Sequence, residues 1–112
     1  MHNELLNTSA IETLDSREVA EMIDIRHDNL IKKIRSYQQI LDSSKLRSQE
    51  FFIPSTYLNS QNKEQPCYLL TKKGCEMVAN KLTGEKGVLF TAQYVNRFEE
   101  MEKKITQPQL PS

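Results

Sequence analysis

The chain of 112 residues has little of what most catalytic and metal sites require. It contains three glycines, and "TGEKG", which holds two of them, lacks the spacing of a phosphate-binding loop. Its two cysteines, Cys67 and Cys75, are eight positions apart with no histidine pair beside them, so neither a zinc site nor a redox motif is predicted. We expect both to be buried free thiols.

Enzyme and membrane signals are also missing. The chain has neither the GxSxG motif of serine hydrolases nor the HExxH motif of zinc proteases, and its acidic residues form no obvious pair for acid-base work. We therefore predict that the chain is not an enzyme and needs no cofactor and no metal. No apolar run reaches the length of a membrane span or of a signal-peptide core, which predicts a cytoplasmic protein.

The charges balance overall but are unevenly placed. With 15 basic and 15 acidic side chains the formal net charge is zero, so net charge gives no support for nucleic-acid binding. Residues 1–15 carry three acidic and no basic side chains, whereas residues 26–47 carry six basic and two acidic ones, a local charge of +4. A nucleic-acid role would therefore depend on how the charges are arranged.

Two helices separated by a short break are predicted in "SREVAEMIDIRHDNLIKKIRSY". Asp15 or Ser16 is the expected cap of the first helix; with Asp15 as the cap, Glu18, three residues on, would complete a capping box. "DIR" breaks the pattern, and the second helix begins near Arg26 or His27. Its core-facing stripe, spaced four, three and four residues, consists of Leu30, Ile34, Tyr37 and Leu41.

The residue pattern changes after position 50. "EFFIPSTYL" and "QPCYLLT" are rich in aromatic and β-branched residues and flank the turn-forming "NSQNKE", which predicts a β-hairpin. Pro54 and Pro66 cannot donate ladder hydrogen bonds, so each is expected at a sheet edge or a strand end. A two-stranded hairpin is marginal alone and should pack on the helices.

Two more helices are predicted downstream. Thr71 caps "KKGCEMVANKL", and "TGEKG" separates that helix from "VLFTAQYVNRFEEMEKKI". Apolar residues of the last helix recur at four, three and four, which is typical of a helix seam. We assign them to a homodimer interface, with burial in the chain's own core as the alternative; they are Tyr94, Phe98, Met101 and Ile105.

The order of these elements predicts an α+β fold of the winged helix-turn-helix type, in which the two-stranded hairpin is the wing and a long helix ends the domain. We expect this domain over residues 13–105. A flexible lead-in over residues 1–12 precedes it, and a disordered tail or linker over residues 106–112 follows it.

In such a module the first residues of the second helix face base edges in the major groove. Arginine bonds guanine and asparagine bonds adenine, so Arg26 and Asn29 are predicted to read bases, and His27 to touch a base edge or a phosphate. The alternative is that this polar helix face is only solvated. The full predicted DNA-binding set, with phosphate contacts from the lysines and Arg35, is Arg26, His27, Asn29, Lys32, Lys33, Arg35, Ser36 and Lys63.

The run from "SREVAEMIDIRHDNLIKKIRSY" through "CYLLTKKGCEMVANKLTGEKG" to "NRFEEME" resembles the Rha family of phage regulatory proteins, over about residues 14–104. The resemblance implies a protein of a temperate phage or prophage whose winged-helix-like module acts in transcriptional regulation. In many relatives a second domain, often of the antirepressor type, follows this module. The sequence reaches only "TQPQLPS", so we expect either a stand-alone short member or a part of a longer protein. The resemblance supplies no contact residues.

Two functions from different classes therefore stay open. In the first, a homodimer binds double-stranded operator DNA through residues 26–36. In the second, the module binds another protein, such as a phage repressor whose activity it blocks, and the helix pair is only a scaffold. The zero net charge favours the second function, whereas the basic cluster and the family resemblance favour the first.

Overall fold

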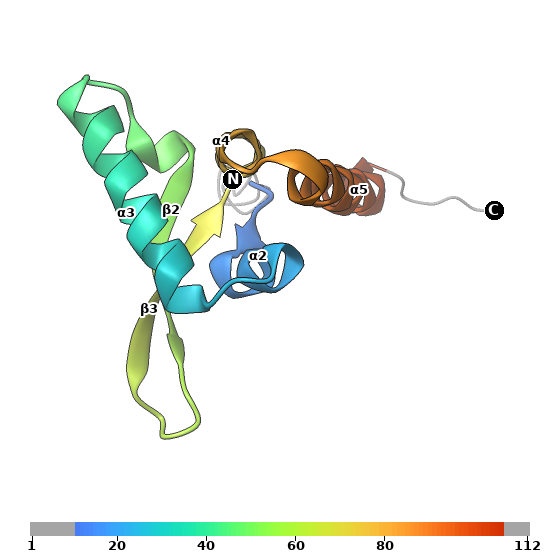
Figure 1. Cartoon of the computed structure of the whole chain (residues 1–112). Coiled ribbons are helices and arrows are strands. Elements are labelled where there is room, and N and C mark those ends of the chain that lie inside the picture. Colours follow the sequence, from blue (N-terminus) through green and yellow to red (C-terminus); the bar gives the residue numbers. More distant parts are fainter. Residues whose placement is uncertain (1–10, 107–112) are drawn as a thin grey trace, which may run out of the picture.

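The computed structural model describes residues 11–106, with side chains as far as Lys103, and this part of the chain has an α+β fold. Its helices lie around a small antiparallel sheet with the strand order β1-β3-β2 (Figure 1). The elements are β1 (Leu14–Asp15), α2 (Ser16–Ile23), α3 (His27–Ser43), the 3-10 turn η1 (Ser48–Glu50), β2 (Phe52–Leu58), β3 (Glu64–Leu70), α4 (Lys72–Lys81) and α5 (Gly84–Thr106).

Helix α2 starts and stops where its local chemistry dictates. The Asp15 carboxylate accepts the Arg17 backbone N–H at 2.8 Å, which confirms Asp15 as the cap. The expected capping box is wrong, because the Glu18 side chain pairs with Arg97 of α5. At the other end Asp24 takes a left-handed conformation (φ 60°) that closes the last turn, so only three residues separate α2 from α3.

Helix α3 begins at His27 with Arg26 as its cap residue, as the sequence predicts. The predicted stripe is confirmed: Leu30, Ile34 and Leu41 are buried and Tyr37 is half-buried. Ile31 also enters the core, which widens the buried face beyond a single stripe. The rest of α3 faces solvent, so one helix serves both the core and an outer surface.

The predicted hairpin is confirmed as β2 and β3, which pair from Phe52 opposite Leu70 to Leu58 opposite Glu64. Asn59 shapes the loop, since its side-chain oxygen accepts the backbone N–H groups of Gln61 and Lys63. Pro54 lies in the edge strand β2, and Pro66 lies in the part of β3 that β1 does not reach. Both prolines therefore sit where the sheet has a free edge.

The sheet has three strands, so the prediction of two was incomplete. Leu14 pairs with Leu70 and Asp15 with Leu69, which adds β1 on the outer side of β3. A strand of two residues is too short to show an alternating pattern, so it could not be predicted from hydrophobic periodicity. Its effect is large, because it fixes the start of α2 against the hairpin.

Thr71 caps α4 as predicted, by accepting the Gly74 N–H at 3.2 Å. A side chain could not replace the hydrogen of Gly74, because an added Cβ would lie 2.1 Å from the Phe51 carbonyl oxygen. The break before the last helix is shorter than expected: α5 begins at Gly84, whose φ of +62° suits glycine, rather than at Val88.

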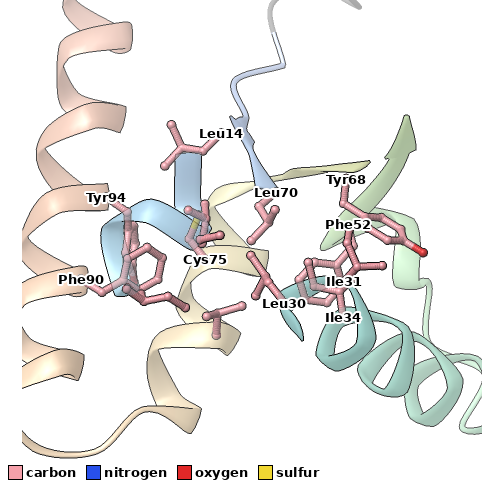
Figure 2. Close-up of a cluster of buried hydrophobic side chains, with 14 of the residues drawn as sticks. Leu14, Leu30, Ile31, Ile34, Phe52, Tyr68, Leu70, Cys75, Phe90 and Tyr94 are labelled. Atoms are coloured by element: carbon pink, nitrogen blue, oxygen red, sulfur yellow. The ribbon is translucent and has the colours of Figure 1, made fainter. Parts of the chain in front are cut away.

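One continuous core joins these elements (Figure 2). Phe90 and Tyr94 of α5 lie at one end of it, Ile34 of α3 and Phe52 of β2 lie at the other, and Leu70 lies between them.

The core changes the interpretation of α5. Tyr94 and Phe98 are buried within this chain and Met101 packs on the same core, which is the alternative to a dimer seam. The side chain of Ile105 lies outside the described residues, as do residues 1–10 of the predicted lead-in and residues 107–112 of the predicted tail.

Candidate nucleic-acid interface

The solvent-facing side of α3 carries a basic surface. Lys32, Lys33 and Arg35 are all exposed, and within residues 11–103 none of them forms an ion pair. A shallow depression of about 520 Å³ on this side is lined by Lys32, Arg35 and Gln39, with Asp42 at its rim. Free cations on a rigid helix are suited to bind phosphate groups.

The first turn of α3 presents a preformed arginine fork. Arg26 donates from Nε and Nη2 to the two carboxylate oxygens of Asp28, at 3.2 and 2.9 Å, although its side chain is 79% exposed. The same contact holds the pKa of Asp28 below its usual range. Asn29 is exposed one position further on. An exposed pair of this kind adds little to stability, so its main effect is to orient Arg26.

His27 does not share this outward orientation. Its Nε2 atom lies 2.8 Å from the Ser16 hydroxyl, and its ring meets the Tyr57 ring edge-on with 6.0 Å between centroids. The Ser16 hydroxyl is fully buried and also accepts the backbone N–H of Tyr68 at 3.0 Å. His27 thus joins the starts of α2 and α3 to the hairpin, and burial lowers its pKa.

The other predicted residues are placed differently. Ser36 is exposed and donates its hydroxyl hydrogen to the Lys33 carbonyl at 2.7 Å, so that hydrogen is already engaged. Lys63 is exposed in the loop of the hairpin, which projects from the body beside the N-terminal end of α3 (Figure 1). The structure therefore places six of the eight predicted residues on α3 and a seventh, Arg26, at its cap, and sets Lys63 apart on the hairpin.

A cluster formed by Asp15, Arg17 and Tyr57 was not predicted from the sequence. Arg17 donates from Nε and Nη2 to the Asp15 carboxylate, at 3.0 and 2.9 Å, and its guanidinium lies 4.1 Å from the Tyr57 ring centre. These contacts lower the pKa of Asp15 and raise that of Arg17. The Asp-x-Arg spacing at a helix start was visible in the sequence, but its link to Tyr57 was not.

The described residues hold neither a metal-binding cluster nor a membrane-spanning helix, and their two cysteines are unpaired. Residues 11–103 contain no group of three or more His, Cys, Asp or Glu side chains that could hold a metal ion. Both cysteines are free and buried, as predicted, and burial raises the pKa of Cys75 to about 12. Among the described helices none is long and apolar enough to cross a membrane.

A family of known proteins matches nearly all the helices and strands described above. The model of the family "Phage regulatory protein Rha" matches residues 14–103, from β1 to the last turns of α5. No solved structure matches the chain.

Two curated relatives match over most of this chain. It is 58% identical over 92 residues to the "SPbeta prophage-derived putative antirepressor protein YoqD" of Bacillus subtilis (strain 168), covering 82% of this chain and 37% of that protein. It is 26% identical over 93 residues to an uncharacterized protein of Haemophilus influenzae, covering 83% of this chain and 53% of that protein. The chain thus spans about half or less of the relatives that it matches. The chain belongs to the Rha family of phage regulatory proteins.

Proposed function

We propose that this chain is a DNA-binding transcriptional regulator of a phage or prophage, with α2 and α3 as a helix-turn-helix and the β2–β3 hairpin as a wing. The observation that carries the proposal is the outer face of α3, where Lys32, Lys33 and Arg35 follow an oriented Arg26 and form no ion pair with any described residue. The three-residue turn between α2 and α3 and the hairpin beside the start of α3 suit this arrangement.

Each residue has a defined task in this proposal. Arg26 and Asn29, in the first turn of α3, contact base edges, and the carboxylate of Asp28 keeps the Arg26 guanidinium in one orientation. Lys32, Lys33 and Arg35 lie further along the helix and bind phosphates, which adds affinity without reading sequence. Lys63 contacts the DNA backbone from the wing.

The wider setting belongs to the same proposal. The chain works in the bacterial cytoplasm, carries out no catalysis and binds as a homodimer to a two-fold operator, whose half-sites lie about 34–36 Å apart. Since Tyr94 and Phe98 are buried in this chain, the dimer contact has to use other side chains.

A titration of duplex DNA over a salt series tests the proposal. Each phosphate that the protein neutralises steepens the log-log dependence of the binding constant on salt by about 0.9. We expect the double variant Lys32→Ala/Lys33→Ala to bind all sequences more weakly and to lose about 1.8 from this slope. Lys86→Ala, which removes an exposed charge on α5, is the matched control and should leave the slope unchanged. An unchanged slope in the double variant would contradict the proposal.

A second candidate function is binding to a repressor protein, and the name of the 58% identical relative favours it. The surface that suits it is an apolar depression of about 690 Å³ between α4 and α5, lined by Leu82, Val88 and Val95 among others. Val88 is 68% exposed there. Under this function Val88→Asp should abolish binding to the cognate repressor while Lys32→Ala/Lys33→Ala leaves it intact.

A further inference from the structure

We propose that Arg17, held over the Tyr57 ring of the hairpin, is a further DNA-contact residue that binds one backbone phosphate between the reading helix and the wing. This inference rests on the proposed DNA-binding function. It adds a side-chain contact from α2, the first helix of the proposed helix-turn-helix, to the contacts proposed for α3 and the hairpin.

Arg17 lies close to the start of α3 and to the hairpin. Arg17 and His27 both contact the ring of Tyr57, so the Arg17 guanidinium lies within two side chains of the first turn of α3. Tyr57 is the second-last residue of β2, opposite Gln65 and close to the loop of the hairpin. A duplex that touches both Arg26 and the hairpin loop would pass over this point, and in helix-turn-helix proteins the first helix of the pair crosses the DNA backbone.

The Arg17 guanidinium is also held in one orientation before any ligand binds. The Asp15 carboxylate takes two guanidinium N–H groups and the Tyr57 ring supports one face, which fixes a side chain that is otherwise long and flexible. An arginine has five N–H donors, so three of them have no partner among the described residues. The side chain remains 48% exposed. A phosphate can therefore bind without breaking the existing contacts.

The two Arg–Asp pairs have different roles in this proposal, a base contact for Arg26 and a phosphate contact for Arg17. Arg17 with Asp15 and Arg26 with Asp28 are both Arg–Asp pairs two residues apart at the start of a helix. Arg26 has no aromatic support and lies at the start of the reading helix, where base edges are within reach. Arg17 lies outside that helix, with its guanidinium 4.1 Å from the Tyr57 ring centre, so we assign it a phosphate and not a base. Neutralising one phosphate would add about 0.9 to the salt slope, and the neighbouring Asp15 charge would reduce this contribution.

Ethylation interference on an operator duplex, with the full chain, tests this contact directly. In the wild-type protein, ethylation of each contacted phosphate should block binding. In Arg17→Ala, ethylation of one of these phosphates should no longer block binding, whereas ethylation of the others still should. The binding constant should fall about tenfold. Arg17→Lys, which keeps the charge, should restore sensitivity at that phosphate, a result that a purely structural role for Arg17 would not give. Lys86→Ala is the control for lost charge away from this surface.

The outcomes separate the two proposals. If the wild type binds duplex DNA and Lys32→Ala/Lys33→Ala lowers the salt slope, but Arg17→Ala leaves the ethylation pattern unchanged, the Arg17 contact is overturned and the proposed function stands. If the wild type shows no salt-dependent binding to any duplex, both are overturned. A cooperative melting transition in Arg17→Ala shows that the variant is folded, and Arg17→Gln serves as the second neutral variant if it is not.

Discussion

The Nε2 atom of His27 lies 2.8 Å from the hydroxyl oxygen of Ser16, and that hydroxyl also accepts the backbone N–H of Tyr68. These three groups come from the first turn of α3, the first turn of α2 and the middle of the hairpin. When the imidazole is neutral, the hydroxyl can donate its hydrogen to Nε2 while one of its lone pairs accepts the Tyr68 N–H. The arrangement defines the geometry on which the proposed DNA surface depends.

Ser16→Ala should destabilise the protein by about 1–3 kcal/mol, because the Tyr68 N–H would then be buried without an acceptor. Urea unfolding at pH 7.5 measures the change. Ser36→Ala is the matched control, since Ser36 is an exposed serine that bonds only within its own helix, and its effect should stay within about 0.5 kcal/mol. Equal losses in the two variants would contradict the assigned role of Ser16.

The stability of the protein should decrease as the pH falls from about 7.5 toward 5. Burial holds the pKa of folded His27 below its unfolded value of 6.5, against the opposing carboxylates of Asp15 and Asp28 and with a smaller contribution from Arg17. The unfolded chain therefore binds the proton more readily. The stabilisation is fully present above pH 6.5 and is lost as the pH falls toward the folded pKa.

His27→Gln should lack this decrease, because glutamine does not titrate. Unfolding free energies of both proteins at closely spaced pH values make the comparison. The lowered pKa of Asp15 acts only in a more acidic range, near and below 3.8, so it does not interfere. A wild-type profile that is parallel to that of His27→Gln would show that His27 is not the titrating group.

Arg26→Ala and Asn29→Ala should each cost about 1–3 kcal/mol of binding free energy on the preferred operator and much less on random DNA. The reason is that base contacts carry sequence discrimination, whereas the phosphate contacts of Lys32 and Lys33 do not. Competition binding with both duplexes measures the difference. Equal losses on the two duplexes would show that Arg26 and Asn29 only hold the backbone.

Phe98→Ala should destabilise the chain by about 3–5 kcal/mol, since its ring is almost fully buried and meets Tyr94 edge-on. Val88→Ala, on the exposed side of the same helix, should change the stability by less than about 0.5 kcal/mol. Thermal melts compare the two. Sedimentation of the wild type at high micromolar concentration tests the dimer separately, and a monomer there would end the expectation of a two-fold operator.

Much of the fold could be predicted because it depends on local chemistry. Asp15 and Thr71 mark helix starts through caps that any reader of the sequence can find, and Asn59 lies in a loop whose composition is typical of turns. The stripe from Leu30 to Leu41 follows from helical spacing alone. These features involve residues that lie close together in the chain.

What the sequence could not give involves distant partners. Glu18 has the spacing of a capping residue, yet it pairs with Arg97, because a tertiary partner outcompeted the local one. The sequence predicts His27 as a DNA contact, and its partners Ser16 and Tyr57 become visible only in the folded structure. The same applies to Arg17, whose place over Tyr57 no spacing rule predicts.

Because of the short strand β1, we expect that α2 and α3 cannot keep their arrangement when they are separated from the rest of the domain. Leu14 pairs with Leu70, and two residues later Ser16 accepts the N–H of Tyr68, a partner 52 positions away. The orientation of the first turn of α3 is thus set by backbone that is synthesised long after it. A fragment that ends with α3 would keep the sequence of the helix pair and lose the β3 contacts that orient it, so we expect the proposed DNA-binding surface to form only when β3 has also folded.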